Sequence, residues 1–239
     1  MNMLSVNRRA ISYMTIAAIL LSALLIVLSY VSSNEGPTSA ELPDGSTTAQ
    51  SGNTTEPRPG IVVSGMSIGS PSAPITIVEY TDFQCHYCQK FALEIEPLID
   101  QYYIQTGKVR FVVKPVVAFG DESRLAAEAS ECAAEQNQFW PYYHALMRLG
   151  LSSSTEDFTV ETAQALAQQL GLNMTLFNES LSSGKFKDKV LQDDAEARGC
   201  GFKAIPAFYV NGVLADEIVE GSFEEFSKIL DAELERLGE

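Results

Sequence analysis

The sequence predicts an α/β domain in which helices flank a central mixed sheet and an all-helical subdomain is inserted into the chain. Three observations lead to this fold class. A strand pattern, a helix pattern and a second strand pattern follow one another over residues 75–114. Residues 121–199 carry helical patterns alone. From residue 207 onward, a strand, a tight turn and another strand precede a last amphipathic helix.

The residues before number 61 are predicted to lie outside this domain. Residues 1–10 form a short polar and basic segment with Arg8 and Arg9, whereas residues 11–31 contain no charged side chain. As a helix, this apolar segment would rise about 31 Å, enough to cross a bilayer. Because positive charge precedes it, we expect a single-pass anchor in the cell membrane, with residues 1–10 in the cytoplasm and the domain outside. The alternative is a cleaved signal peptide, which would leave a secreted or periplasmic protein.

Residues 32–60 are rich in Ser, Thr, Gly and Pro and are predicted to form a disordered linker, because so few apolar side chains cannot offset the entropy of ordering. The whole chain has a net charge of −15, with acidic residues spread along the domain. A solvated acidic surface accounts for this balance, which argues against nucleic-acid binding. The four cysteines, an even number, and the membrane-crossing signal together indicate an oxidising compartment.

The folded domain, residues 61–239, begins with a short strand pattern at Ile61-Val62-Val63. Residues 75–80 form an apolar pattern typical of a buried parallel strand. The following helix pattern extends to about Gln105 and contains Pro97, which should kink it. Residues 109–114 form the next strand, so that strand, helix and strand predict a βαβ unit with parallel strands and a right-handed crossover.

The helical patterns between about residues 117 and 200 predict an insertion into this α/β domain. Thr159 is a candidate N-cap for one of its helices. After the insertion, Asn211-Gly212 predicts a hairpin between two short antiparallel strands. Ser222 and Glu225 have the spacing of a capping box and should open the last helix.

The chemistry-bearing motif is Cys85-x-x-Cys88, at the junction of the first buried strand and its helix. Peptide N–H groups and the helix dipole stabilise a thiolate at such a position. A zinc site would need another ligand pair, and only the isolated Cys132, Cys200 and His144 remain. A purely structural disulfide would close a very small loop and add little stability. The motif therefore predicts a redox-active dithiol, with no metal.

Three stretches resemble the DsbA-like thiol-disulfide oxidoreductases, and the resemblance runs from about Ile61 to the C-terminus. These stretches are VEYTDFQCHYC, ECAAEQNQFWPYYHALM and FKAIPAFYVNG. The resemblance implies a thioredoxin-like fold with an inserted helical subdomain and a protein disulfide oxidoreductase that needs no cofactor.

The resemblance also implies roles for particular residues. Cys85 would be the nucleophile and Cys88 the resolving thiol of a redox-active disulfide. Pro206 would be a cis-proline that faces the disulfide, although an ordinary trans-proline at the start of a strand is the alternative. The backbone of Ile205 would pair with an extended substrate peptide, and Tyr87 would contact the substrate as well.

Glu79 would lie buried beneath the disulfide and help to move the proton of Cys88, unless strand alternation places it on a solvated face. His86 would stabilise the Cys85 thiolate when protonated, unless it is an exposed loop residue without effect. The dipeptide departs from the family pattern in two ways. Many members have Pro where His86 stands, and the best-known strong oxidants have His where Tyr87 stands.

Cys132 and Cys200 form the other pair. In some DsbA-like proteins a second disulfide ties the insertion to the core, and the resemblance implies such a bond here. It would contribute a few kcal/mol in the chain-entropy model. The alternative is two separate buried thiols. The aromatic side chains near Trp140 are expected to be core, and His144 is expected to have no chemical role.

These inferences predict a membrane-anchored extracytoplasmic enzyme that introduces disulfides into exported proteins. Its partners would be reduced or misoxidised exported proteins and a membrane reoxidant of the DsbB or VKOR type. We expect a monomer, because no added dimerisation domain of the kind found in isomerases is evident. Two alternatives stay open: a reductase or isomerase, for example in cytochrome c maturation, and a non-enzymatic Cu(I)-binding or chaperone module.

Overall fold

The computed structural model describes the domain but not the predicted anchor and linker. Among the residues that it describes, no helix is both long and apolar enough to cross a membrane. The predicted cytoplasmic segment (1–10), span (11–31) and linker (32–60) lie outside the described residues. The described residues are 62–152, 158–216, 218 and 221–239.

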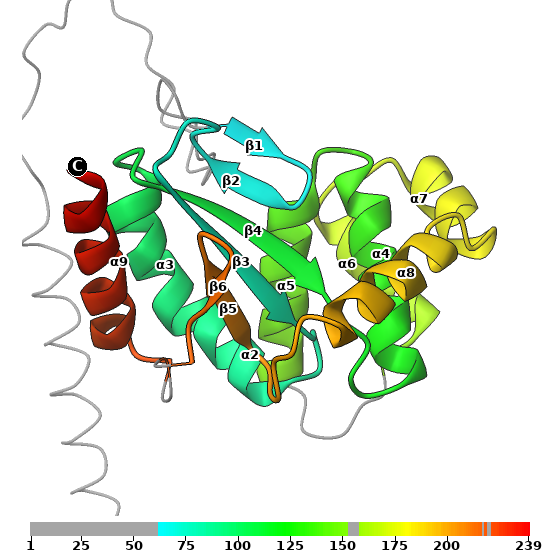
Figure 1. Cartoon of the computed structure of the whole chain (residues 1–239). Helices are drawn as coiled ribbons and strands as arrows, with labels where there is room; N and C mark the ends of the chain where they lie inside the picture. The colour runs from blue at the N-terminus through cyan, green and yellow to red at the C-terminus, as the bar shows by residue number, and fades with distance from the viewer. Residues whose placement is uncertain (1–61, 153–157, 217, 219–220) are drawn as a thin grey trace, which may run out of the picture. The chain divides into compact units, whose positions relative to one another are not determined.

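The described part of the chain contains a six-stranded mixed sheet in the order β1-β2-β4-β3-β5-β6 (Figure 1). Strands β3 and β4 are parallel, and the other neighbours are antiparallel. The βαβ unit and the mixed sheet are therefore confirmed. The strands are β1 (Val62–Ser64), β2 (Ser67–Gly69), β3 (Ile75–Thr81), β4 (Val109–Pro115), β5 (Ala207–Val210) and β6 (Val213–Leu214).

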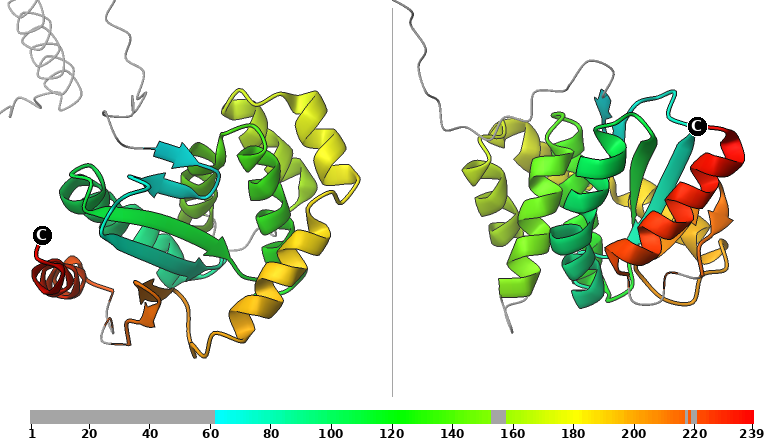
Figure 2. Two further views of the ribbon diagram at one scale, coloured as in Figure 1. Left: turned by 45° about the horizontal axis from the view of Figure 1, so that its top comes forward. Right: turned by 90° about the vertical axis from the view of Figure 1, so that its left-hand side faces the viewer.

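Helices cover both faces of this sheet, and the inserted helices gather beside it. The left view of Figure 2 shows α7 and α8 (yellow and gold) to one side of the sheet and α9 (red) to the other. The predicted helical insertion is thus confirmed. The helices are α2 (His86–Lys90), η1 (Phe91–Ile95), α3 (Glu96–Ile99), η2 (Asp100–Ile104), α4 (Asp121–Ala134), α5 (Phe139–Ser152), α6 (Val160–Gln169), α7 (Met174–Ser182), α8 (Lys187–Arg198) and α9 (Phe223–Leu237).

Successive side chains of β3 point to opposite faces of the sheet, so they belong to two separate hydrophobic clusters. Ile77 belongs to the larger cluster, in which the ring of Phe91 lies 5.3 Å from that of Phe226 in α9. Tyr80 belongs to a smaller cluster with Ala197 of α8. One face is therefore covered by the helix that follows β3 and by α9, and the other by α8.

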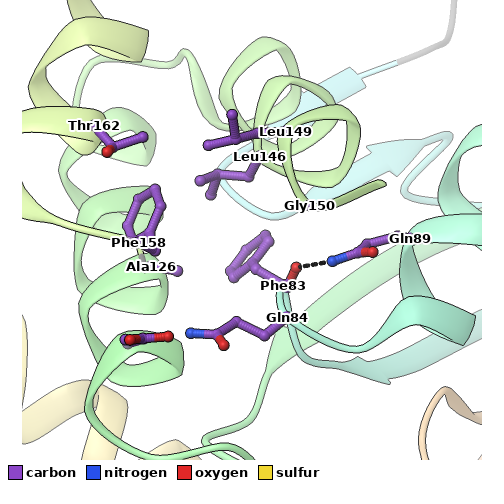
Figure 3. A pocket seen from close by; sticks show the side chains of 10 residues that line it. Phe83, Gln84, Gln89, Ala126, Leu146, Leu149, Gly150, Phe158 and Thr162 are labelled. Carbon is purple, nitrogen blue, oxygen red and sulfur yellow. Dashed lines mark hydrogen bonds between the residues drawn. The ribbon is translucent and has the colours of Figure 1, made fainter. Parts of the chain in front are cut away.

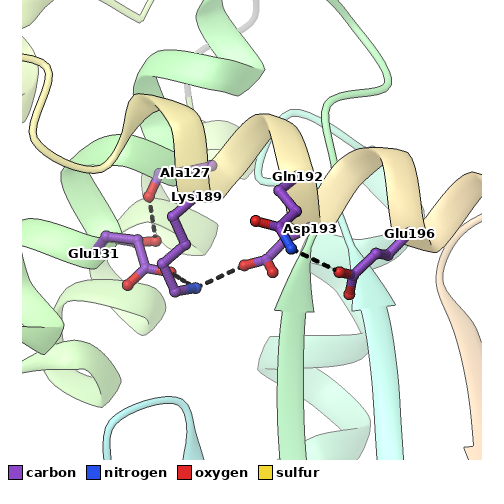
Figure 4. A network of polar contacts seen from close by, with 7 residues as sticks. Ala127, Glu131, Lys189, Gln192, Asp193 and Glu196 are labelled. Carbon is purple, nitrogen blue, oxygen red and sulfur yellow. Dashed lines mark hydrogen bonds and ion pairs between the residues drawn. The ribbon is translucent and has the colours of Figure 1, made fainter.

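Helices α4 and α8 run antiparallel and are joined by charged side chains (Figure 4). Lys189 of α8 contacts the buried carboxylate of Glu131 and also Asp193. At the other end of α8, Asp194 accepts a hydrogen bond from the Val117 N–H at 2.9 Å. These contacts fix α8 along α4, with Lys189 near the C-terminal end of α4.

Most local predictions are confirmed. Thr159 accepts the Thr162 N–H as an N-cap, and the Ser222/Glu225 capping box is formed. Asn211 has a positive φ of 49°, as the predicted hairpin turn requires. The helix continues through Pro97, and π-helical turns on both sides take the place of a sharp kink. Strand β2 was not predicted, because three residues are too few for a clear alternation.

Candidate active site

Cys85 lies where β3 gives way to the next helix. Its backbone is extended (φ −74°, ψ 116°), and the helix begins at His86, so Cys85 is the N-cap residue. Its N–H donates to the Asp82 carbonyl at 3.0 Å, which fixes the turn between strand and helix. The side chain is only 5% exposed, and the sulfur faces the first N–H groups of the helix. This is the position at which a helix best stabilises an anion.

The two cysteines differ in their acidity. The Cys88 thiol, together with the backbone N–H groups of Cys88 and Tyr87, lowers the pKa of Cys85 to about 6, against the opposing effects of burial and of Asp82. The pKa of Cys88 is raised, mainly by complete burial and then by its hydrogen bond to Cys85 and the nearby Glu79. One thiol is therefore an exchangeable thiolate at neutral pH and the other holds its proton.

The loop before β5 approaches the dithiol from the other side. The Ile205–Pro206 peptide bond is cis, as predicted. The carbonyl oxygen of Ile205 lies 3.7 Å from the sulfur of Cys85. Next to it, a groove of about 730 Å³ is lined by Tyr87, Ile205 and Pro206 together with Phe91 and other residues. The structure thus brings the three predicted substrate-contacting residues to one surface, and the Tyr87 side chain is 72% exposed there.

Glu79 is completely buried in the middle of β3, which excludes the alternative of a solvated face. Burial raises the pKa of its carboxyl group to about 8. The Tyr143 hydroxyl donates to one carboxyl oxygen at 3.3 Å, and the other oxygen, Oε1, has no hydrogen-bond partner. The negative charge of Glu79 raises the pKa of Cys88, so the two groups interact electrostatically. Such a carboxyl group is suited to deliver and accept a proton near neutral pH.

His86 is exposed, and its ring packs edge-on against Tyr87 with the centroids 5.9 Å apart. The groups that lower the pKa of Cys85 are the Cys88 thiol and backbone N–H groups. The predicted stabilisation of the Cys85 thiolate by His86 therefore stays a prediction.

Asp82 is a buried site residue that the sequence analysis did not identify. Its carboxylate accepts the N–H groups of Gln84 at 2.9 Å and Ala118 at 2.7 Å, and so ties the active-site loop to the start of the insertion. Burial raises its pKa, whereas these hydrogen bonds lower it. The signal was present: an acidic side chain three residues before Cys85, directly after a buried strand.

Glu96 and His144 were also missed as a pair. Glu96 is 4% exposed, and its Oε2 lies 2.7 Å from Nε2 of His144. His144, for which no chemical role was predicted, thus has a buried carboxyl group as its partner. Cys88, Ala92 and Glu96 follow one another at four-residue spacing and are all buried. An acidic residue on this apolar helix face was therefore the available signal.

The structure does not bring together Cys132 and Cys200, the pair for which a second disulfide was predicted. Cys132 is buried next to Glu131, which contacts Lys189 near the start of α8. Cys200 is exposed beyond the opposite end of α8 and contacts the Tyr80 hydroxyl at 3.3 Å. About eleven residues of helix, or about 16 Å, separate these places, whereas a disulfide needs Cα atoms within about 7 Å.

A second, smaller cavity of about 150 Å³ lies behind the active-site loop (Figure 3). The ring of Phe83 points into it, and the Gln89 amide donates to the Phe83 carbonyl at 2.7 Å. Gly150 of α5 lies against Gln89, where a Cβ atom would be 2.0 Å from its Nε2. The glycine therefore allows α5 to approach α2. Within the described ranges, no three His, Cys, Asp or Glu side chains are grouped as metal ligands.

Comparison with known proteins agrees with this geometry. The thioredoxin family matches residues 62–232. The probable disulfide bond formation protein D of Bacillus anthracis is 29% identical over 174 residues, which cover 71% of this chain and 78% of the relative. The disulfide bond formation protein D of Bacillus subtilis is 28% identical over 172 residues, covering 70% of this chain and 76% of the relative.

Solved structures show the same fold. Oxidised BdbD from Bacillus subtilis superposes with a TM-score of 0.66 and 27% identity, covering 72% of this chain and 93% of that chain. The α-DsbA1 protein of Wolbachia pipientis has a TM-score of 0.63 and 23% identity, covering 75% and 94%. The thioredoxin-like fold with a helical insertion is thereby confirmed. The chain belongs to the thioredoxin family, among its DsbA-like protein disulfide oxidoreductases.

Proposed function

We propose that this oxidoreductase is a membrane-anchored, extracytoplasmic donor of disulfides to exported proteins, acting through a Cys85–Cys88 disulfide. The observation that carries the proposal is the difference between the two thiols. The Cys85 sulfur has a pKa of about 6, whereas that of the buried Cys88 is raised. A thiolate that is stable in the reduced protein makes the corresponding disulfide a better oxidant. Relatives named for disulfide bond formation support the same direction.

The exchange takes place in two steps. A substrate thiolate attacks Sγ of Cys85, the Cys85–Cys88 bond breaks, and Cys88 leaves as a thiolate that takes a proton from Glu79. A second substrate thiolate then attacks the substrate sulfur of the mixed disulfide, and Cys85 leaves as a thiolate. The substrate loses two electrons and gains a disulfide, and the enzyme is left as the dithiol. The low pKa of Cys85 favours it as the leaving group in the second step.

The groove lined by Tyr87, Ile205 and Pro206 would hold the substrate beside Cys85. An extended peptide could pair with the backbone of Ile205, whose carbonyl faces the reacting sulfur. Such main-chain pairing is independent of side-chain identity, as an enzyme acting on many reduced or misoxidised exported proteins requires.

The cellular setting follows from the sequence. Residues 11–31 would anchor the protein with the domain outside, and residues 32–60 would give it reach. A membrane oxidase of the DsbB or VKOR type, linked to quinone, would restore the disulfide of a monomeric enzyme. If the span is cleaved instead, the same domain would act as a secreted or periplasmic protein.

The reduction potential of the full chain in mild detergent tests the direction of electron flow. The protein is equilibrated with glutathione redox buffers and the free thiols are alkylated and counted by mass spectrometry. We expect a potential above roughly −200 mV, more oxidising than the glutaredoxins. A value near that of thioredoxin, about −270 mV, would refute the donor role and favour a reductase. Cys88→Ser should trap a mixed disulfide with substrate, and Cys85→Ser should not.

A further inference from the structure

Behind the dithiol, a second buried carboxyl group lies close to Glu79. Glu96 of α3 is 4% exposed, and its charge acts on both Glu79 and the Tyr143 hydroxyl. Its Oε2 lies 2.7 Å from Nε2 of His144, whose side chain is 30% exposed. His144, at one end of this series, is partly exposed to solvent, and the charge of Glu79, at the other end, raises the pKa of the Cys88 thiol.

Glu79 needs such a connection, because it has no solvent exposure of its own. The titratable groups that face it are Glu96 from α3, Tyr143 from α5 and the thiols of Cys85 and Cys88. None of these four is a cation that could hold Glu79 permanently ionised. Each time Glu79 gives its proton to Cys88, it must therefore recover one, and the Tyr143 hydroxyl already donates to its Oε2 at 3.3 Å.

We propose that Glu96 and His144 form the outer half of a proton-exchange path that joins Glu79, through the Tyr143 hydroxyl, to solvent. In this role His144 and Glu96 are positioning residues, because neither touches the reacting sulfur atoms. The inference rests on the proposed thiol chemistry of Cys85 and Cys88, but it holds for electron flow in either direction.

The protons balance as follows. Attack on Cys85 releases Cys88 as a thiolate, and the Glu79 carboxyl group transfers its proton to that sulfur. As the Glu79 carboxylate takes the proton of the Tyr143 hydroxyl, the Tyr143 oxygen takes a proton from the Glu96–His144 pair in the same step, so that no buried tyrosinate is formed. His144 then takes a proton from water, so that one proton has moved from solvent to Cys88 with no change of oxidation state along the path. Reoxidation of the dithiol returns the proton by the same groups.

The position of His144 suits the outer end of this path, because part of its side chain is exposed. A histidine at the surface can pick up and release protons near neutral pH, and a carboxylate at hydrogen-bond distance orients its ring. The rings of Trp140 and Tyr143 pack against it, with centroids 6.1 and 5.2 Å away, which limits its rotation. The imidazole is thus fixed with Nε2 toward Glu96 and part of the ring toward water.

The test is the rate at which dithiothreitol reduces the oxidised full-length protein, followed by rapid quenching with an alkylating agent. The wild-type protein must first react through Cys85; failure there would remove the proposed function itself. We compare Glu96→Gln, His144→Gln and His144→Ala with Glu224→Gln as the matched control. Glu224 is a fully exposed glutamate on α9, so its substitution makes the same chemical change away from the site.

We expect the three site variants to react on the order of tenfold more slowly near neutral pH, within the range of general acid–base effects, and Glu224→Gln to be unchanged. Added imidazole, at constant pH and ionic strength, should restore the rate of His144→Ala in proportion to its concentration. Tetramethylammonium chloride, which carries no transferable proton, should not.

Two results would overturn the inference: rates within about twofold of wild type, or slow rates that imidazole leaves unchanged although the variant is folded by circular dichroism. If His144→Ala does not fold, His144→Gln, which retains an N–H donor toward Glu96, is judged by its pH profile. The wild-type inflection due to Glu79 should then flatten or shift, and an unaltered profile would equally reject the path.

Discussion

Replacement of Glu79 by glutamine should change how the stability of the reduced domain depends on pH. Burial raises the Glu79 pKa from 4.5 to about 8, so the folded state holds a proton that the unfolded state releases. The unfolded chain therefore binds fewer protons in this window, and stability falls as pH rises from 4.5 to about 8. Each pH unit between the two pKa values changes the free energy of unfolding by about 1.4 kcal/mol, so the loss of stability is about 5 kcal/mol over the whole window. Between about pH 5 and about pH 7 it is about 2 to 3 kcal/mol.

Glutamine has almost the same shape but no charge to lose, so this pH-dependent loss should vanish in Glu79→Gln. The assay is urea unfolding of both reduced proteins, followed by circular dichroism from about pH 5 to about pH 8. The variant should gain about 2 to 3 kcal/mol relative to wild type between about pH 5 and about pH 7. The lowered pKa of Cys85 acts in the opposite direction but is common to both proteins, so it largely cancels in the difference. A difference that stays constant within about 0.5 kcal/mol would refute a buried, protonated Glu79.

Three further predictions concern neighbouring groups. His86→Ala should move the Cys85 pKa by less than about one unit in a thiolate absorbance titration, because the imidazole is exposed and its charge is screened by salt. Asp82→Asn should lower the Cys85 pKa in the same titration, because the negative charge of Asp82 opposes the thiolate; a higher value would contradict this. Lys189→Met should destabilise the protein by about 1 to 3 kcal/mol at neutral pH, because it leaves the Glu131 carboxylate buried without its cation. Burial raises the pKa of Glu131, so its carboxylate is protonated at acid pH and urea unfolding should show a smaller loss of stability there. A loss independent of pH would contradict a buried, charged Glu131.

Short-range features of the fold were predictable from sequence. The Ser222/Glu225 capping box, the Thr159 cap and the turn at Asn211 depend on groups within three residues of one another, so the local residues decide them. The position of Cys85 at a helix N-terminus is likewise decided by neighbouring residues. The short strand β2 could not be foreseen, since its three residues are held by pairing with β4.

The positions of Cys132 and Cys200 could not be predicted from local sequence patterns. Cys132 and Cys200 were paired by analogy, but the antiparallel packing of α4 and α8 places them at opposite ends of a helix. Which thiols can meet depends on how two helices pack, and helical periodicity contains no information on that choice.

The sequence by itself determined the redox motif and the order of the strands and helices other than β2, because each depends on residues close together along the chain. Whether Glu79 is buried was decided by the packed structure. The tertiary structure alone decided which groups surround the dithiol: Tyr143 and His144 from α5, Glu96 from α3 and the Ile205 carbonyl from the loop before β5. The chemistry of a buried thiol or carboxyl group is set by desolvation and by charges a few ångströms away. Those neighbours come from distant parts of the chain, so only the packed domain defines them.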